Sequence, residues 1–161
     1  MLDINEIIPG RLWVGAYVRA EEVTELERLG ITTVVSMQTE EDLRHCGIAF
    51  NALEQAYLNS RIRYVRLPVP DFDQDALVRH LPGAIVEIER IMADSSNKVY
   101  LHCTAGINRS PTAAAGYLIK SRGISVCEAL NYVTSRRDCD PAMDILEKYA
   151  IALTGTPGDE S

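Results

Sequence analysis

Short apolar runs alternate along this chain with longer segments whose apolar residues recur at helical spacing. The runs at residues 31–37 (ITTVVSM) and 98–103 (KVYLHC) are too short for helices and are rich in β-branched or other apolar residues, which indicates buried strands. Between them, residues 77–92 place apolar side chains at i, i+3 and i+4, the pattern of a helix with one buried face. Such alternation predicts an α/β fold with a largely parallel sheet and helices on both faces.

The remaining predicted elements continue this alternation. Residues 4–15 (INEIIPGRLWVG) read as short strands around a Pro-Gly turn. Further elements are predicted as helices at 20–29, 49–59, 109–122, 125–136 and 143–153, and as a strand at 63–69. The 161 residues are enough for one domain with its own core. We therefore expect a single domain over residues 1–153 and a flexible C-terminal tail over 154–161.

Charge and cysteine content argue against several classes of function. A formal net charge of −7 disfavours binding to nucleic acid or to an anionic membrane surface, yet it is compatible with a small local anion site. No stretch approaches the roughly 20 apolar residues of a membrane span, and the N-terminus carries no export signal. The four cysteines show neither paired nor metal-ligand spacing: Cys46, Cys103, Cys127 and Cys139. We expect a protein of the reducing cytoplasm.

The segment HCTAGINRSPT, residues 102–112, carries the most informative pattern. It joins a predicted strand to a predicted helix, at the sheet edge where open α/β proteins bind ligands. A helix N-terminus offers unpaired N–H groups and the positive end of a dipole, and both favour phosphate. Gly106 lets the backbone curl into an anion-binding nest, and Arg109 can hold two phosphate oxygens at once. The residues expected to bind phosphate are Thr104, Ala105, Gly106, Ile107, Asn108 and Arg109.

A cysteine inside an anion site is a nucleophile placed against an electrophilic phosphate. The loop amides, the helix dipole and Arg109 all favour the thiolate form of Cys103. Attack on a phosphate monoester would give a cysteinyl-phosphate, with Arg109 stabilising charge on the equatorial oxygens. Ser110 can hydrogen-bond the thiolate as it leaves, and we expect His102 to hold the shape of the loop. No metal or other cofactor is implied, because the protein itself supplies the nucleophile and the positive charge.

The segment HCTAGINRS resembles the His-Cys-x5-Arg-Ser signature of the protein tyrosine phosphatase superfamily, and PTAAAGYL after it resembles the dual-specificity branch. The resemblance implies the fold of that branch and hydrolysis of phosphate monoesters. Two other functions also use such a loop. Rhodanese-like sulfurtransferases commonly have a shorter one, and phosphate-binding modules without catalysis usually lack the cysteine, the arginine or the acid.

The leaving oxygen needs a proton, and a carboxyl on a separate loop is the usual source. The stretch PVPDFDQDA offers Asp71, Asp73 and Asp75 just before the helix predicted at 77–92. Asp73 and Asp75 are also well placed to cap that helix. In the dual-specificity family the acid lies about thirty residues upstream of the cysteine, in this same loop. The resemblance therefore implies that Asp71 is the general acid.

Residues 30–140 resemble the plant glucan phosphatases, a group related to laforin, through stretches such as VVSMQTEEDLRHCGI and TSRRDCDP. The resemblance implies that Phe72 helps to hold a sugar chain, and packing of the ring against its own loop is the alternative. His45 and Cys46 stand where that group has an aromatic pair, and Asn108 stands where it usually has glycine. Phosphotyrosine in proteins, with or without phosphoserine and phosphothreonine, is therefore the leading substrate, and a phosphorylated glucan is the alternative. Phosphoinositides are disfavoured by the acidic chain and by the absence of lysine from the loop.

Residues outside the loop receive simpler interpretations. Cys127 is predicted to pack in the core, whereas Cys46 and Cys139 are left open as partners for an oxidised Cys103. Two arginines at a predicted helix end, Arg136 and Arg137, are expected to meet terminal carbonyls or solvent, with the substrate rim as the alternative for either. His80 is predicted to lie on the surface of its helix.

Overall fold

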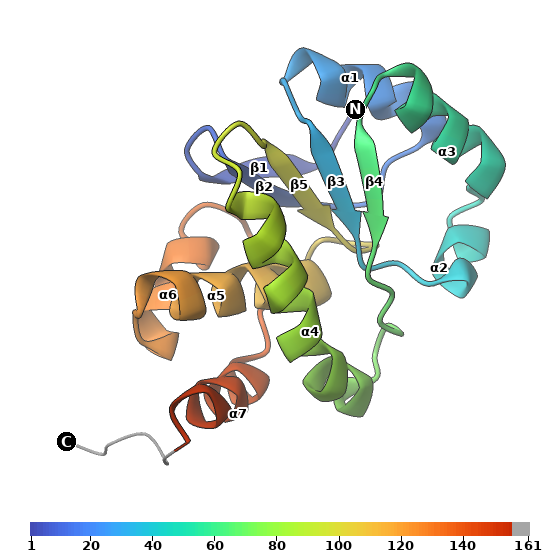
Figure 1. Cartoon of the computed structure of the whole chain (residues 1–161). Coiled ribbons are helices and arrows are strands. Elements are labelled where there is room, and N and C mark those ends of the chain that lie inside the picture. Colours follow the sequence, from blue (N-terminus) through green and yellow to red (C-terminus); the bar gives the residue numbers. More distant parts are fainter. Residues whose placement is uncertain (156–161) are drawn as a thin grey trace.

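The computed structural model describes residues 1–155, which build a five-stranded sheet with helices on both faces (Figure 1). The strand order is β1-β2-β5-β3-β4. β1 (Ile4–Ile8) runs antiparallel to β2 (Leu12–Gly15), and the other neighbours are parallel. The parallel strands are β5 (Val99–His102), β3 (Thr33–Ser36) and β4 (Arg63–Arg66). The α/β fold predicted from the sequence is confirmed.

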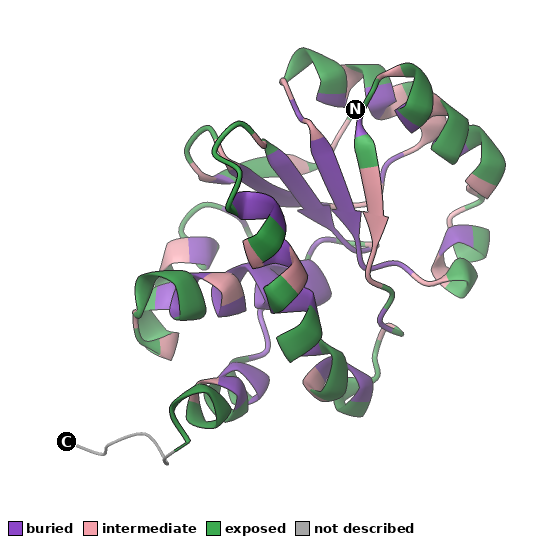
Figure 2. Ribbon diagram, in the orientation of Figure 1, coloured by how far each residue is buried: buried purple, intermediate pink, exposed green. Residues whose placement is uncertain are grey.

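Each face of the sheet carries its own hydrophobic cluster, because successive strand residues point to opposite sides. Val35 and Leu101 pack with α4 (Gln74–Met92), α5 (Arg109–Arg122), α6 (Val126–Thr134) and α7 (Met143–Thr154). Val34 and Tyr100 pack on the other face with α1 (Val23–Arg28) and α3 (Phe50–Asn59). The short 3-10 helix η1 (Ala20–Glu22) leads into α1. Figure 2 shows the central strands buried between these two layers.

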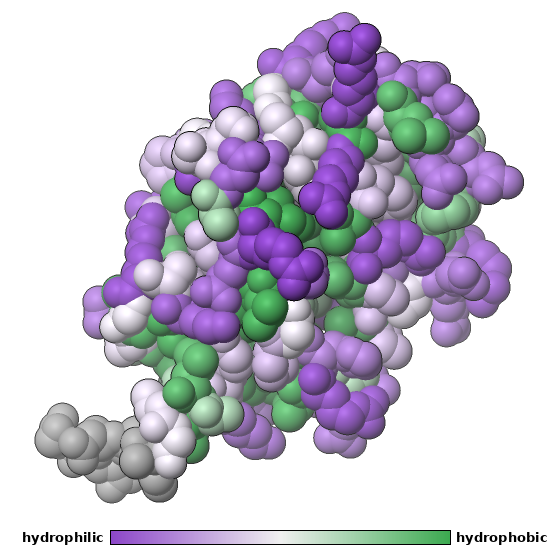
Figure 3. Space-filling view, viewed as in Figure 1, coloured by the Kyte–Doolittle hydropathy of each residue, from purple (hydrophilic) through white to green (hydrophobic). Residues whose placement is uncertain are grey.

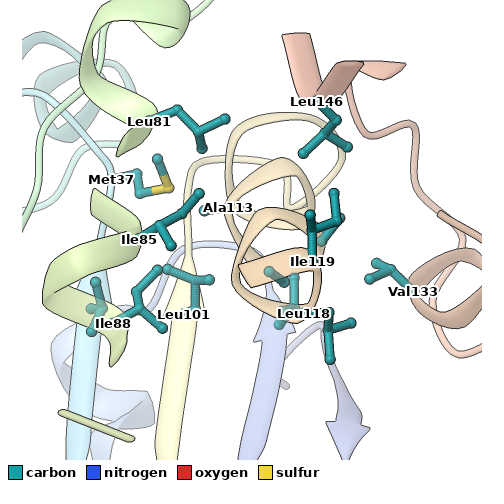
Figure 4. Packing of buried hydrophobic residues seen from close by; sticks show 14 of the residues in the cluster. Met37, Leu81, Ile85, Ile88, Leu101, Ala113, Leu118, Ile119, Val133 and Leu146 are labelled. Atoms are coloured by element: carbon teal, nitrogen blue, oxygen red, sulfur yellow. The ribbon is translucent and has the colours of Figure 1, made fainter. Parts of the chain in front are cut away.

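Helix α5 follows the loop of residues 103–108 and is the most buried helix among residues 1–155. Ala113, Ala114 and Ala115 are fully buried, and a side chain at Gly116 would collide with Ile85 of α4. Small residues therefore let the backbone of α5 approach α4 closely, as the packing around Ala113 and Ile85 illustrates (Figure 4). The helix that carries Arg109 and Ser110 is fixed on all sides.

Most predicted elements are found within a few residues of their expected ends, and two differences bear on the site. Helix α2 (Glu40–His45) was not predicted, since it is only six residues long; Thr39 and Asp42 start it with a reciprocal capping box. Helix α4 begins at Gln74 rather than Leu77, because the Asp73 carboxylate accepts a hydrogen bond from the N–H of Ala76 at 2.9 Å.

The C-terminal helix α7 reaches Thr154, and residues 156–161 of the expected tail lie outside the described residues. Hydrophilic side chains cover much of the surface in the view of Figure 3, with smaller hydrophobic patches between them. Within residues 1–155, no helix has both the length and the apolarity to cross a membrane.

Candidate active site

The loop between β5 and α5 turns its carbonyl groups away from the space that it encloses. Gly106 makes this path possible with a φ of 68°, in the left-handed region that favours glycine. Six consecutive carbonyls accept hydrogen bonds from groups behind the loop: Cys103 from His102, Thr104 from Tyr17, Ala105 and Gly106 from Arg137, Ile107 from Asp140, and Asn108 from Thr112. Among residues 1–155, no backbone carbonyl accepts from the N–H groups of residues 104–108.

Cys103 and Ser110 lie together at the base of this loop. The Cys103 Sγ is 3.2 Å from the Ser110 Oγ, and both residues are buried. The end of β5 positions the cysteine, and the first turn of α5 positions the serine. The hydroxyl can therefore donate to a thiolate sulfur without any movement of either element.

The Arg109 guanidinium is 2% exposed and is held by groups from three other segments. Its Nη1 donates to the carbonyl oxygens of Met37 (3.3 Å) and Val69 (2.7 Å) and to Asp42 Oδ2 (2.8 Å). Its Nη2 lies 3.2 Å from Thr104 Oγ1 and 3.1 Å from Asp71 Oδ2. The buried Nε has no hydrogen-bond partner among the described residues. One donor of this arginine is thus left for a ligand.

Asp71 is the only carboxylate of the predicted acid loop that reaches Arg109 within residues 1–155. Its Oδ1 accepts a hydrogen bond from the N–H of Phe72 at 3.1 Å. Phe72 has a φ of 59° and is 95% exposed, so its ring does not pack the loop. Asp73 caps α4 as expected, and Asp75 lies exposed in the first turn of that helix. The structure therefore brings Asp71, and not the other two carboxylates, to the site.

His102 faces away from the enclosed space, as expected for a supporting residue. Its Nδ1 lies 2.9 Å from the Cys103 carbonyl oxygen, and its ring stacks on Tyr100 with centroids 5.3 Å apart. Because the carbonyl can only accept, Nδ1 carries the hydrogen. Burial lowers the pKa of His102 to about 4, so the ring is neutral at ordinary pH.

A groove of about 690 Å³ leads to the loop. It passes between the start of α2 and the Asp71 loop, and four of its lining residues are acidic. The lining consists of Thr39, Glu40, Glu41, Asp42, His45, Pro70, Asp71, Phe72, Thr104 and Ala105. Among the described lining residues, Phe72 is the only aromatic ring apart from the imidazole of His45. The described lining of the groove is therefore acidic, and Arg109 lies behind it, paired with Asp42 and Asp71.

Two predictions about residues outside the loop are wrong. Cys127 is exposed on α6 instead of packed in the core. Arg137 is buried behind the loop, whereas Arg136 does donate to a carbonyl near the end of α6, that of Tyr132. His80 is exposed on α4, as predicted. All four thiols are free. Burial raises the pKa of Cys46, and raises that of Cys139 to about 11, so both stay protonated at neutral pH.

Sequence reasoning missed two site residues, Asp42 and Arg137. For Asp42 a signal was present, because Thr39 followed three residues later by an acidic residue is a helix-start pattern that would have placed a carboxylate near the end of β3. Nothing in the sequence distinguished Arg137 from Arg136.

Comparison with known families gives these residues a context. Residues 12–146 match the family model described as "Dual specificity phosphatase, catalytic domain". The chain belongs to the dual-specificity phosphatases, within the protein tyrosine phosphatase superfamily.

Individual relatives fall into more than one substrate group. The chain is 29% identical to "Phosphoglucan phosphatase DSP4, amyloplastic" of Castanea sativa, over 96% of this chain and 42% of that protein. It is 30% identical to "Dual specificity protein phosphatase Mpk3" of Drosophila melanogaster, over 89% of this chain and 32% of that protein. The chain thus spans less than half the length of these curated relatives.

The fold is shared with solved structures. The human tyrosine phosphatase-like serine/threonine/tyrosine-interacting protein superposes with a TM-score of 0.73 at 26% identity, covering 95% of this chain and 99% of that one. The resemblance of the loop to the dual-specificity branch, and that of residues 30–140 to plant glucan phosphatases, are confirmed by these matches.

Proposed function

We propose that this chain is a cysteine-dependent phosphatase that hydrolyses phosphotyrosine in proteins, and also phosphoserine and phosphothreonine. The observation that carries the chemistry is the unpartnered Nε of the buried Arg109, beside the Asp71 carboxylate and at the base of a loop whose carbonyls all face outward. A buried donor without a partner costs free energy unless a ligand accepts from it. A phosphate bound over Cys103 would do so.

The reaction proceeds in two displacements. The Cys103 thiolate attacks phosphorus, the bond from phosphorus to the ester oxygen breaks, and the Asp71 carboxyl gives its proton to that oxygen. Arg109 and the loop amides stabilise the charge on the equatorial oxygens. In the second displacement water attacks the cysteinyl-phosphate, the Asp71 carboxylate takes a proton from that water, and the bond from sulfur to phosphorus breaks. The Ser110 hydroxyl then donates to the departing thiolate across the 3.2 Å that separates the two side chains.

The groove favours a phosphorylated protein over a polyanion. Phosphoinositides carry several negative charges, and the rim would repel them through Glu40 and Glu41. The described residues that line the groove include neither lysine nor arginine. A peptide segment, by contrast, can present neutral or basic side chains next to its phosphorylated residue. Electrostatic complementarity of this kind governs both association rate and specificity.

A phosphorylated glucan is the second candidate, because one relative that matches 96% of this chain is a phosphoglucan phosphatase. The exposed ring of Phe72 could stack on a sugar. His45 is a weaker platform than an aromatic pair, and Cys46 beside it is half-buried against Gln38. The rhodanese-like and catalytically silent alternatives lose their support, since the loop keeps its five intervening residues and the site keeps its cysteine, arginine and acid.

The test compares wild type with Cys103→Ser and Asp71→Ala in the presence of reductant. The substrates are p-nitrophenyl phosphate, matched phosphotyrosyl and phosphothreonyl peptides, a phosphoinositide and phosphorylated amylopectin. We expect Cys103→Ser to abolish turnover of every ester. We expect Asp71→Ala to slow hydrolysis of the phosphothreonyl peptide, an alkyl ester, by about 100-fold or more. Hydrolysis of p-nitrophenyl phosphate should slow much less, because p-nitrophenolate leaves without a proton. Asp73→Ala, in the same loop but bonded to α4, is the matched control.

The peptide and glucan arms of this test decide the substrate. A higher kcat/KM for phosphotyrosyl peptides supports a protein phosphatase, and a higher value for amylopectin supports the second candidate instead. Turnover that survives Cys103→Ser would contradict the mechanism. The free thiols fit a reducing compartment, so a cytoplasmic location stays part of the proposal.

A further inference from the structure

Arg137 lies behind the phosphate-binding loop with all of its donors in use. Its side chain is 5% exposed, and an arginine side chain has five N–H groups. Nε donates to the Gly106 carbonyl at 2.7 Å, and Nη2 donates to the Ala105 carbonyl and to Asp3 Oδ2, both at 3.1 Å. Nη1 donates to Asp3 Oδ1 at 2.9 Å and to Asn5 Oδ1 at 3.0 Å. Five donors therefore meet five acceptors.

These contacts join two distant parts of the chain. Ala105 and Gly106 belong to the loop, whereas Asp3 directly precedes β1 and Asn5 lies within it. The Asp3 carboxylate takes both Nη atoms of Arg137 in a fork, the geometry that fixes a guanidinium most firmly. The hydrogen bond from Arg137 is also the main reason why the pKa of Asp3 is lowered. The N-terminal edge of the sheet thus fixes the plane of Arg137.

The plane of Arg137 in turn fixes two peptide planes. In a trans peptide the carbonyl and the N–H of the next residue point in opposite directions. When Arg137 holds the Ala105 carbonyl outward, the Gly106 N–H points into the loop, and the Gly106 carbonyl fixes the Ile107 N–H in the same way. These two amides belong to the set expected to bind the phosphate oxygens.

We propose that Arg137, anchored by Asp3 and Asn5, is a positioning residue that aims the Gly106 and Ile107 amides at the phosphate. This role rests on the phosphate-binding function proposed for the loop, but not on which ester is hydrolysed. Lysine could not replace Arg137, because a single ammonium cannot hold two adjacent carbonyls and a carboxylate fork in one plane. A side chain at position 106 would also lie 2.6 Å from Arg137 Nη2 and would clash with Gly15, so the glycine leaves room for the guanidinium.

The test uses Arg137→Met and Arg137→Lys, with Arg136→Met as the matched control. Arg136 is the neighbouring arginine and is exposed against Tyr132, outside the site. The first readout is kcat and KM for p-nitrophenyl phosphate. The second is orthovanadate binding, measured by its protection of Cys103 against iodoacetamide, which needs no turnover. The third is the pH dependence of that alkylation, and the fourth is the thermal midpoint of unfolding.

We expect Arg137→Met and Arg137→Lys to lower kcat/KM by about 100-fold, the scale of a small misplacement in a catalytic site. Orthovanadate protection should weaken in parallel, and alkylation of Cys103 should require a higher pH. Asp3→Asn, which keeps the fold because Asp3 is largely exposed, should give a smaller loss of about three- to tenfold. Arg136→Met should leave all four readouts at wild-type values.

Two results would overturn the proposal. One is a pair of Arg137 variants that unfold at lower temperature but keep kcat/KM, orthovanadate protection and the alkylation profile within about twofold of Arg136→Met. The other is an Asp3→Asn variant with unchanged kinetics when the Arg137 variants do not fold. A third result would separate the two proposals. If the wild type hydrolyses no ester, and the Arg137→Met variant binds orthovanadate more weakly than the wild type, the proposed function is contradicted and the positioning role is supported.

Discussion

Two buried arginines hold the phosphate-binding loop from opposite sides, and they differ in how completely they are bonded. On the outer side, Arg137 has all five donors in use within the protein. On the inner side, Arg109 leaves its Nε without a partner among residues 1–155, although it is even less exposed. A buried donor without a partner costs free energy. The difference therefore indicates that Arg137 stabilises the loop, whereas Arg109 keeps a donor for a ligand.

The carboxylates around the two arginines follow the same division. Asp3 gives Arg137 a full bidentate fork, whereas Asp42 and Asp71 each give Arg109 one oxygen. These contacts orient the Arg109 guanidinium but leave its Nε donor without a partner among residues 1–155. Substitutions at Arg109 and its partners should therefore affect activity first, and substitutions at Arg137 and its partners should affect both activity and the conformation of the loop.

Arg109→Lys should have the largest effect on activity. Lysine keeps the positive charge but loses the planar fork, so we expect kcat/KM for p-nitrophenyl phosphate to fall by about 1000-fold. The unfolding free energy, measured with urea, should change by less than about 2 kcal/mol because the charge near Asp42 and Asp71 is kept. A loss of activity no larger than that of Arg137→Lys would erase the contrast between the two arginines.

Gly106→Ala tests the contact where both sides of the loop meet. The alanine backbone would have to adopt a φ of 68°, and its methyl group would clash with the Gly15 backbone and with Arg137. We expect a loss of about 100-fold in kcat/KM and a destabilisation of about 1–3 kcal/mol, because the strain displaces the loop amides. Gly47→Ala provides the control: its φ of 67° is similar, but open space surrounds it. Equal kinetic losses in the two variants would show that backbone strain alone matters.

Asp42→Asn should have a smaller effect. The amide keeps one acceptor for Arg109 Nη1 but removes the charge, so the guanidinium is held less firmly. We expect kcat/KM to fall by about tenfold, with little change in KM, because the arginine is positioned less well in the transition state. Glu41→Gln, one residue earlier on α2 and paired only with His45, is the matched control. Equal kcat/KM values for Asp42→Asn and Glu41→Gln would contradict a role for Asp42.

His102 supplies the outer-side contact whose loss should show in stability more than in activity. Its pKa of about 4 lies below the unfolded value of 6.5, so the unfolded state binds a proton first as the pH falls. The contribution of neutral His102 to the free energy of unfolding is fully present above pH 6.5. It decreases as the pH falls towards 4, by at most about 1.4 kcal/mol per pH unit. His102→Asn keeps a donor for the Cys103 carbonyl and removes the titration.

Urea unfolding of both proteins at pH 7, 6 and 5 measures this effect. The variant should lose less stability than wild type over that range, and the two curves should converge. Parallel curves would mean that His102 does not contribute to the pH dependence of folding.

The sequence alone could predict the features that depend on neighbouring residues. The strands β3 and β5 and the helix α5 follow from runs of apolar residues, and the loop from Cys103 to Arg109 follows from a contiguous motif. The acid Asp71 required a family resemblance as well. The contacts of Asp42 with Arg109 and of Asp3 with Arg137 span 67 and 134 residues. Such contacts depend on the strand order β1-β2-β5-β3-β4, which local patterns do not encode.

The close packing of α5 has a consequence for motion during turnover. This helix packs against α4, α6 and α7 and against strands β2 and β5. Its alanines are fully buried in these contacts. Cys103 and Arg109 are therefore held by a closely packed part of the fold. Residues 70–73 are mostly exposed: Asp71 pairs with Arg109 and Asp73 caps α4, while Phe72 projects into solvent. We expect the segment that carries Asp71, which already lies 3.1 Å from Arg109, to open and close over a fixed base, and this motion to set the timing of substrate entry and product release.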